Sequence, residues 1–341
     1  MIRRFITASG LAVVTIVFAF ASPAFADAGT NTNYSSVVTS ISPPTPSFTA
    51  RVTGGDSFLE LAVQPGHVVI VEGYEHEPYL QILADGTVQT NEKSPATYLN
   101  NDRYAATPLP AEADAKAAPQ WKTVATGGTY AWHSHLIHFM SPGTPEVLKQ
   151  QGRESGFVQN WTINLTVDGV PTRISGTLNL LDAPSPFPSI VIALVIAGVG
   201  LLLLRKWTVA PLGVIAGGLA ITVSAIEQGS IPTGTPTQTW VIVLGIVVVA
   251  FSLGALALRA NRVVRSLCQL ASGVVAVVWT ITRVDVLRNA VLVSTLNPAV
   301  ARCLVAVCGG LGCALVTHAI PGLAPSFDEL DGDSPQTDSR Q

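Results

Sequence analysis

Residues 158–204 read VQNWTINLTVDGVPTRISGTLNLLDAPSPFPSIVIALVIAGVGLLLL and contain both kinds of structure expected in this chain. The part from 158 to 181 alternates apolar and polar residues on either side of Asp168-Gly169, which predicts a β-hairpin. The part from 188 to 204 is continuously apolar and long enough to cross a bilayer. The Pro-rich segment 182–187 predicts a stiff linker from a β-rich domain into a membrane helix.

The composition supports this division. The chain has 341 residues, of which 48% are hydrophobic and only 12% are charged, against about 25% charged residues in an ordinary soluble domain. The formal net charge of −3 and the lack of a basic patch give no indication of a nucleic-acid partner. We therefore expect a multi-domain membrane protein with an exported domain (27–181), a linker (182–187), transmembrane helices (188–320) and a polar tail (321–341).

The N-terminus has the features of a secretory signal peptide over residues 1–26. Arg3 and Arg4 provide the charged start, an apolar run follows, and Ala24-Phe25-Ala26 is a small-x-small cleavage site. The mature chain is expected to begin near Asp27, with the exported domain outside the cell membrane. An uncleaved first membrane helix is the alternative, although the apolar run is short for a span.

Five membrane spans are expected, at about 188–204, 207–226, 240–258, 266–282 and 299–320. Arg205 and Lys206 follow the first span and Arg259 follows the third, so the positive-inside rule places these ends in the cytoplasm. An odd number of spans then places the C-terminus in the cytoplasm as well. The segment 283–302 carries arginines on the outer side, against the rule, and a re-entrant or interfacial piece is the alternative there.

The exported domain is predicted to be all-β. Short runs rich in β-branched and aromatic residues, bounded by Gly, Pro or Asp, indicate strands at 47–52, 58–63, 68–73, 79–83, 158–167 and 172–181. Asp85-Gly86 indicates a further hairpin turn, and 90–120 reads as a long irregular segment. Many short strands at close spacing favour a β-sandwich.

Residues 130–140, YAWHSHLIHFM, contain three of the six histidines and the only methionine besides the initiator. A strand over 129–135 would place His133 and His135 on one face. His138 and Met140 can join them only if the chain bends near Leu136 or Ile137. The pattern predicts a metal site made of His133, His135, His138 and Met140, with His67 and His76 as further candidate ligands.

Imidazole and thioether together favour copper, because a thioether suits Cu(I). Zinc held by three histidines is the alternative, and it would be favoured if Glu75 or Glu77 took part. The other interpretation is that the cluster serves the fold through hydrogen bonds to the backbone. All four cysteines lie in the membrane half, so the exported domain has neither a disulfide nor a cysteine ligand.

The chain resembles a family of actinobacterial membrane proteins that have a signal peptide, a β-rich exported domain with a Trp-His-x-His-x-x-His-x-Met segment, and C-terminal spans. The resemblance covers nearly the whole chain but supplies no function. Ser134 and Leu136 stand where the family pattern is expected to have Asp and Arg. The matching segments are Gly54-Gly55-Asp56-x-Phe58-Leu59-Glu60-Leu61, Gly73-Tyr74-x-x-Glu77-Pro78-Tyr79-Leu80, Ser94-Pro95-Ala96-Thr97-Tyr98-Leu99-Asn100 and residues 130–142.

A looser similarity to periplasmic copper-binding domains of cupredoxin-like type rests on the ligand types and the β class alone. That similarity implies a cupredoxin-like or immunoglobulin-like sandwich, but the blue-copper pattern is not met because no cysteine ligand is present.

Three functions follow as hypotheses. The first is a membrane-anchored copper-binding protein that stores, delivers or imports copper and exchanges it with other metal-trafficking proteins. The second is a non-enzymatic envelope protein that interacts with other components or has a structural role. The third is a zinc-dependent hydrolase, in which Glu75 or Glu77 would be the general base. No catalytic residue is assigned, and a lipid bilayer is the expected partner in all three.

Overall fold

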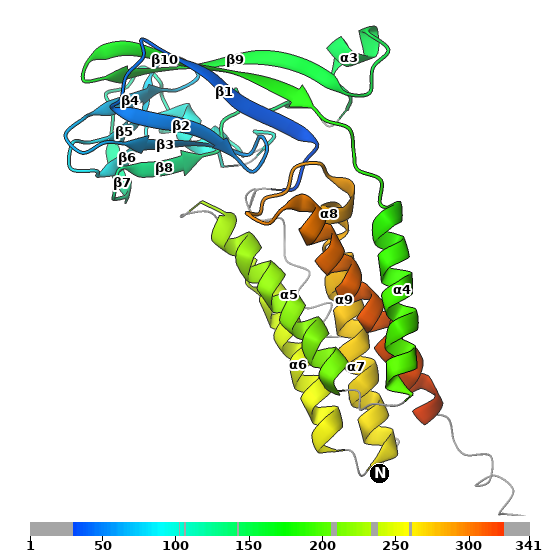
Figure 1. Ribbon diagram of the computed structural model, residues 1–341. Helices are drawn as coiled ribbons and strands as arrows, with labels where there is room; N and C mark the ends of the chain where they lie inside the picture. The colour runs from blue at the N-terminus through cyan, green and yellow to red at the C-terminus, as the bar shows by residue number, and fades with distance from the viewer. Residues whose placement is uncertain are drawn as a thin grey trace, which may run out of the picture. The chain divides into compact units, whose positions relative to one another are not determined.

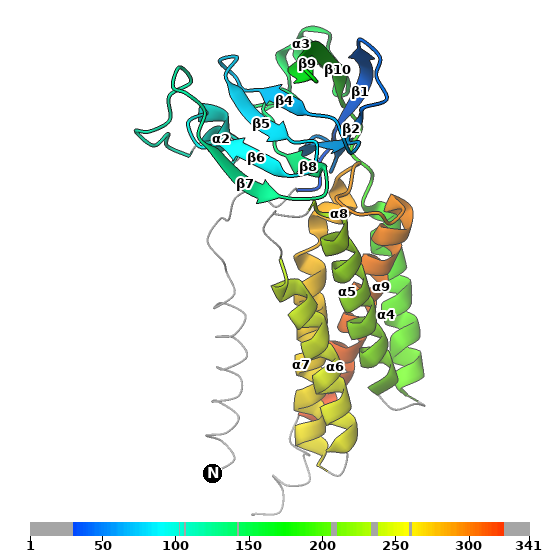
Figure 2. The same ribbon diagram turned by 90° about the vertical axis from the view of Figure 1, so that its left-hand side faces the viewer.

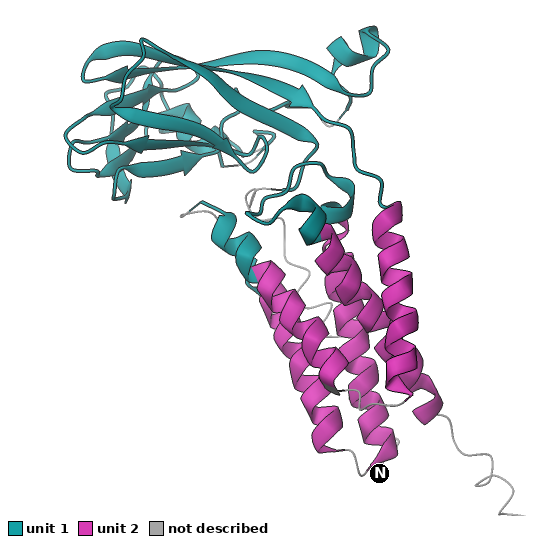
Figure 3. Ribbon diagram, in the orientation of Figure 1, with its two compact units in different colours: residues 1–186, 225–239, 285–301 teal, residues 187–224, 240–284, 302–341 magenta. Residues whose placement is uncertain are grey.

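A computed structural model describes residues 30–101, 103–105, 107–141, 143–205, 210–232, 238–258 and 261–323. The predicted signal peptide (1–26) and residues 324–341 of the predicted tail lie outside these residues. The chain divides into two compact units, coloured in Figure 3. The first contains residues 1–186, 225–239 and 285–301, and the second contains 187–224, 240–284 and 302–341.

The first unit contains two antiparallel sheets (Figure 1 and Figure 2). One has seven strands in the order β1-β10-β9-β4-β5-β6-β7, and the other has three in the order β2-β3-β8. The strands are β1 (Tyr34–Ser42), β2 (Phe48–Thr53), β3 (Phe58–Val63), β4 (Val69–Glu72), β5 (Pro78–Ile82), β6 (Val88–Asn91), β7 (Trp121–Ala125), β8 (Thr129–Trp132), β9 (Gly156–Val167) and β10 (Val170–Leu180).

The two sheets share one hydrophobic core. Leu61 from β3 and Trp132 from β8 belong to the same buried cluster as Leu80, Trp161 and Ile174 from the larger sheet. The side chains of β9 and β10 alternate between buried and exposed, as expected for strands with one face on a core. The three-stranded sheet therefore carries β8, which leads into the histidine segment, directly on the core.

The hairpin predicted around Asp168-Gly169 is confirmed. Val167 pairs with Val170, and both turn residues have positive φ, 50° for Asp168 and 80° for Gly169. This is the conformation that a two-residue turn needs to follow the twist of its strands. The hairpin around Asp85-Gly86 is confirmed as well, because Ile82 pairs with Val88.

In the described part of residues 30–186, two strands and two short helices were not predicted. β1 and β7 are the edges of the seven-stranded sheet, and their exposed positions leave only a weak hydrophobic pattern. The predicted irregular segment 90–120 includes the short helix α2 (Pro95–Leu99), capped by the Ser94 hydroxyl, which accepts the N–H of Ala96. The other short helix is α3 (Glu146–Gln150).

The segment 283–302 contains a short helix, α8 (Val284–Arg288), followed by chain that pairs with the start of the β-rich part. Thr32 and Val291 exchange two backbone hydrogen bonds, of 3.0 and 2.9 Å. The side chains of Asn31 and Asn33 accept the N–H groups of Val293 and Ala290. Residues 285–301 therefore belong to the same compact unit as the sheets.

The second unit is helical, and the described part of the chain includes five helices long and apolar enough to cross a membrane. Its packing relies on small residues, as expected for helices in lipid: a side chain at Gly217 would collide with Gly245 and Val249, and one at Gly273 with Gly312. The five helices are α4 (Phe187–Leu204), α5 (Ala210–Ser230), α6 (Trp240–Ala257), α7 (Arg262–Ile281) and α9 (Pro298–Ala319), the last extended by a 3-10 turn (Ile320–Gly322).

Buried polar side chains in this unit satisfy one another between helices. The hydroxyls of Ser252 and Ser272 lie 2.7 Å apart, and the indole N–H of Trp279 donates to the Ser224 hydroxyl over 3.0 Å. On α9, Cys308 is buried whereas Cys303 and Cys313 are exposed, so the three do not share a face, as their spacing predicts. These contacts are those of a packed helical bundle.

Candidate metal site

The histidine segment begins where β8 ends. β8 stops at Trp132, which is paired with Leu59 of β3, so the prediction of a strand over 129–135 is wrong for its last three residues. Beyond this end, Nδ1 of the His133 ring lies 2.7 Å from the backbone carbonyl oxygen of Ser57, just before β3. His133 is consequently only 5% exposed, and it does not share a strand face with His135.

A tight turn brings the three histidines together. The N–H of Ile137 donates to the carbonyl of Ser134 over 3.2 Å, so the chain reverses at His135 and Leu136, as the predicted bend requires. Ile137 is fully buried in the core, and Trp132 is buried on the other side of the turn. Two apolar anchors therefore fix the turn at both ends.

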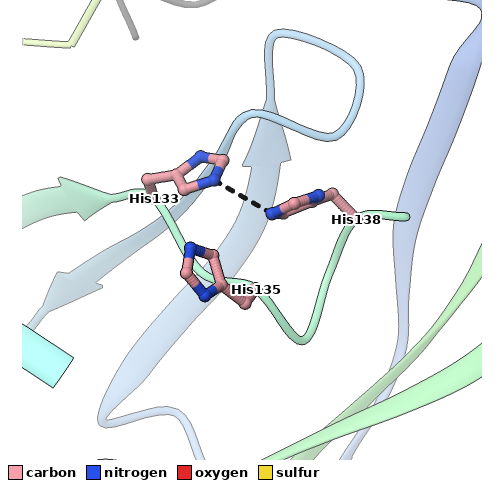
Figure 4. A group of neighbouring side chains, drawn as sticks. All are labelled: His133, His135 and His138. Atoms are coloured by element: carbon pink, nitrogen blue, oxygen red, sulfur yellow. Dashed lines mark hydrogen bonds between the residues drawn. The ribbon is translucent and has the colours of Figure 1, made fainter. Parts of the chain in front are cut away.

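His133 and His138 face each other across this turn (Figure 4). Their Nε2 atoms lie 3.0 Å apart, and the ring of His138 is only 1% exposed. Two metal-bound nitrogens about 2.0–2.1 Å from a tetrahedral ion are about 3.4 Å apart. The pair is therefore close to the spacing that a shared metal ion would impose.

The hydrogen bonds define the proton positions on this pair. The Ser57 carbonyl is only an acceptor, so Nδ1 of His133 carries a proton, and when the ring is neutral its Nε2 presents a lone pair. Nε2 of His138 must then donate in the 3.0 Å contact. Metal-binding histidines commonly donate their second N–H to a carbonyl in this way, which fixes the tautomer and the ring orientation.

Burial, together with the smaller effect of the neighbouring His133 ring, lowers the pKa of His138 to about 3. Desolvation disfavours the charged imidazolium form. The ring is therefore neutral at neutral pH, which is the form that binds a metal ion.

His135 completes the group from a half-buried position. Its ring is stacked on that of Tyr74, with centroids 5.6 Å apart and planes inclined by 15°. Its backbone N–H donates to the Tyr74 hydroxyl over 2.9 Å, and that hydroxyl donates in turn to Asn100 at the end of α2. Burial raises the pKa of Tyr74 to about 12. The phenol therefore stays protonated, and its hydroxyl accepts the backbone N–H of His135.

The three histidines form a group that could hold a metal ion. Each offers a ring nitrogen, and these nitrogens all lie within 4.8 Å of one another. His135 meets both partners edge-on, with ring centroids 5.6 Å from His133 and 5.4 Å from His138. Three imidazoles around one point can serve copper or zinc, with a fourth position left for another ligand.

Met140 lies at the rim of an open hollow of about 500 Å³. His135 and His138 line the same hollow, together with residues 159–162 of β9. The Met140 side chain is 41% exposed. Met140 and two of the three histidines therefore line one hollow.

The other candidate ligands form separate pairs. Nδ1 of His67 lies 2.7 Å from a carboxylate oxygen of Asp168, and Nδ1 of His76 lies 3.0 Å from Glu72. Glu77 is buried and accepts hydrogen bonds from the Ser94 hydroxyl and the Glu75 N–H. Among the described residues, neither histidine and neither glutamate of residues 75–77 belongs to the group that could hold a metal.

Sequence reasoning missed the residues that support the histidines. The Ser57 carbonyl orients His133, and the Tyr74 hydroxyl, itself bonded to Asn100, holds His135. Arg103, which is paired with Asp56 over 2.5 Å, lowers the pKa of His138. A signal was present for Tyr74 and Asn100, because both are specified in the segments that carry the family resemblance, whereas the first of those segments leaves position 57 open. Those segments meet around the cluster although they are far apart in sequence.

Comparisons with known proteins add no relative. No family model matches the chain, and no curated protein or solved structure matches it. The resemblance to the actinobacterial family therefore rests on the segments quoted above. The cupredoxin-like or immunoglobulin-like character of the β-rich part is not confirmed.

Proposed function

We propose that this protein is a membrane-anchored, extracytoplasmic metal-binding protein that holds one copper ion through His133, His135 and His138. Copper storage, delivery or import is the role that we propose for it. The observation that carries the proposal is the buried His133–His138 pair, whose Nε2 atoms lie 3.0 Å apart with His133 oriented by the Ser57 carbonyl.

The charge of the site favours copper in the reduced state. The group consists of imidazoles only, without a carboxylate to neutralise a divalent ion. His133 and His138 are both almost fully buried, and burying a charge is costly unless it is compensated. A monovalent Cu(I) ion incurs a smaller cost than Zn²⁺, and imidazole with a thioether nearby suits it.

The helical part supplies the anchor in this proposal. Five of its helices are long and apolar enough to cross a membrane. The segments 225–239 and 285–301 belong to the same compact unit as the sheets. Counting five spans from the cytoplasmic Arg205 places both segments on the outer side, although the arginines near 285–301 run against the positive-inside rule. We propose that this unit lies outside the cell membrane and exchanges copper with other metal-trafficking proteins.

The test is copper binding by the full-length protein in lipid nanodiscs. A fragment ending at the linker is unsuitable, because residues 285–301 contribute backbone hydrogen bonds to the β-rich unit. Cu(I) affinity is measured by competition with a chromophoric chelator for the unsubstituted protein, the His133→Ala/His138→Ala variant and the matched control His67→Ala/His76→Ala.

We expect one Cu(I) per chain in the unsubstituted protein and in the control, and none held tightly in the His133→Ala/His138→Ala variant. Equal affinity in all three proteins, or no binding by any, would contradict the proposal.

A role of the cluster in the fold is favoured by one observation, the hydrogen bond from His133 to Ser57. Thermal unfolding separates the two functions, since a ligand that binds only the native state raises the unfolding temperature. On our proposal, Cu(I) stabilises the unsubstituted protein and not the His133→Ala/His138→Ala variant. On the structural alternative, the substitutions destabilise the protein and Cu(I) has no effect on either.

A further inference from the structure

The three histidines and Met140 differ in their access to solvent. His133 and His138 are 5% and 1% exposed, His135 is half-buried, and Met140 is 41% exposed. Only His135 and His138 of the three histidines line the hollow on which Met140 stands. The candidate ligands thus form a graded series from the open rim to the buried pair.

From this gradient we infer that Met140 and His135 form an outer copper station, through which Cu(I) enters and leaves the buried three-histidine site. The inference rests on the proposed function and extends it. Met140 is then a transfer ligand and is absent from the final coordination sphere, which contains His133, His135 and His138.

The chemistry of the rim residue fits this role. A thioether is an uncharged soft ligand that prefers Cu(I) to Zn²⁺, and methionine is flexible enough to follow a moving ion. Leu136, 40% exposed, shares the hollow but has no ligand atom. An incoming ion therefore finds Met140 as the exposed soft ligand beside His135.

His135 is suited to take part in both stations. Its ring is edge-on to His133 and His138, it lines the hollow with Met140, and its backbone is held by the Tyr74 hydroxyl. A ligand shared between two positions lets the ion move without passing through an uncoordinated state.

The transfer is a ligand exchange without redox change. Bonds from Cu(I) to the Met140 sulfur and to a ring nitrogen of His135 form as the bonds to the donor chelator break, and the bond to His135 is then kept. Bonds to the Nε2 atoms of His138 and His133 then form as the copper–sulfur bond breaks. The proton that His138 Nε2 donates to His133 in the metal-free protein moves to Nδ1 of the His138 ring, and copper stays Cu(I) throughout.

The test compares rates with affinities for the full-length protein in nanodiscs. Cu(I) uptake from a chromophoric chelator is followed by stopped-flow absorbance for the unsubstituted protein, Met140→Leu and the control Leu136→Ala. Met140→Leu keeps the size and apolar character of the side chain but removes the sulfur. Zn²⁺ uptake is measured in parallel, because zinc has little preference for a thioether.

We expect Met140→Leu to slow Cu(I) uptake about tenfold, as when one ligand is lost from the rate-limiting barrier, with unchanged Cu(I) affinity and an unchanged Zn²⁺ rate. Leu136→Ala should leave both rates unchanged. Cu(I) uptake by Met140→Leu at the unsubstituted rate would overturn the inference, and so would a loss of Cu(I) affinity, which would make Met140 a resident ligand. Failure of the unsubstituted protein to bind any metal would instead refute the proposed function.

Discussion

At the residue scale, the candidate site depends on the groups that orient each imidazole. His133 is fixed by a backbone carbonyl, whereas His135 is fixed by a side chain, that of Tyr74, through ring stacking and a hydrogen bond from its backbone N–H. Loss of such a supporting partner typically weakens metal binding about 10–100-fold. A substitution can remove the support from the Tyr74 side chain, whereas it cannot remove the backbone carbonyl that supports His133.

Replacing Tyr74 separates the stacking from the hydrogen bond. Tyr74→Phe keeps the ring against His135 but removes the hydroxyl, so we expect Cu(I) affinity to fall about tenfold. Tyr74→Leu removes the aromatic ring as well and should reduce the affinity further. Competition with a chelator measures both, and Tyr98→Phe is the control, since Tyr98 donates to the Glu92 carbonyl instead. Unchanged affinity in Tyr74→Leu would show that His135 needs no support.

The three histidines that could hold a metal ion could be singled out from the sequence, but their arrangement could not. Three histidines within six residues are visible in the printed chain. β8 ends at Trp132, and the next residue, His133, contacts Ser57, from which it is separated by 76 positions. The alternation of neighbouring residues does not reflect such a long-range contact, so a prediction based on it extends the strand through His135.

At the element scale, the turn that carries the ligands is anchored by its apolar neighbours. Ile137 follows the reversal and is fully buried in the shared core, and its N–H closes the turn on Ser134. The ligand geometry and the packing of the core are therefore coupled through one side chain.

Truncating Ile137 tests this coupling. Ile137→Ala should lower the free energy of unfolding of the β-rich unit by about 2–5 kcal/mol, and Ile137→Val by about 0.5–1.5 kcal/mol. Tryptophan fluorescence during chemical denaturation measures both values, because Trp132 and Trp161 are in the same core. We also expect Cu(I) affinity to fall in Ile137→Ala, and a large loss of stability with full affinity would contradict the coupling.

The strands illustrate what local sequence can determine. Hairpins with a two-residue turn, such as β9–β10, are predicted correctly because their alternation and their Asp-Gly turns are local signals. β1 is missed because its partner is β10, more than 130 residues later in the chain, and because it is an edge strand with few buried residues.

At the scale of the whole molecule, the chain combines a β-rich unit with helices that could cross a membrane. Length and apolar composition suffice to predict those helices, whereas the pairing of residues 285–301 with residues 31–33 is a long-range contact without a local signal. Because of this pairing, the segment 285–301 is an ordered part of the β-rich unit and not only a connection between two helices.

The predicted topology can be tested by labelling cysteines from one side of the membrane. Single-cysteine variants Val170→Cys, Thr295→Cys and Arg205→Cys are made in a background without the four native cysteines, each at an exposed position. A membrane-impermeant maleimide should label the first two in intact cells and Arg205→Cys only after permeabilisation. Labelling of Arg205→Cys in intact cells would place the first span in the opposite orientation.

The central claim is that His133, His135 and His138 together bind a metal ion, and X-ray absorption at the copper K-edge tests it most directly. The full-length protein is loaded with one equivalent of Cu(I) in nanodiscs. We predict the multiple-scattering pattern of imidazole rings from three nitrogen ligands, without a sulfur shell. A spectrum without imidazole scattering, or one dominated by sulfur, would contradict the account.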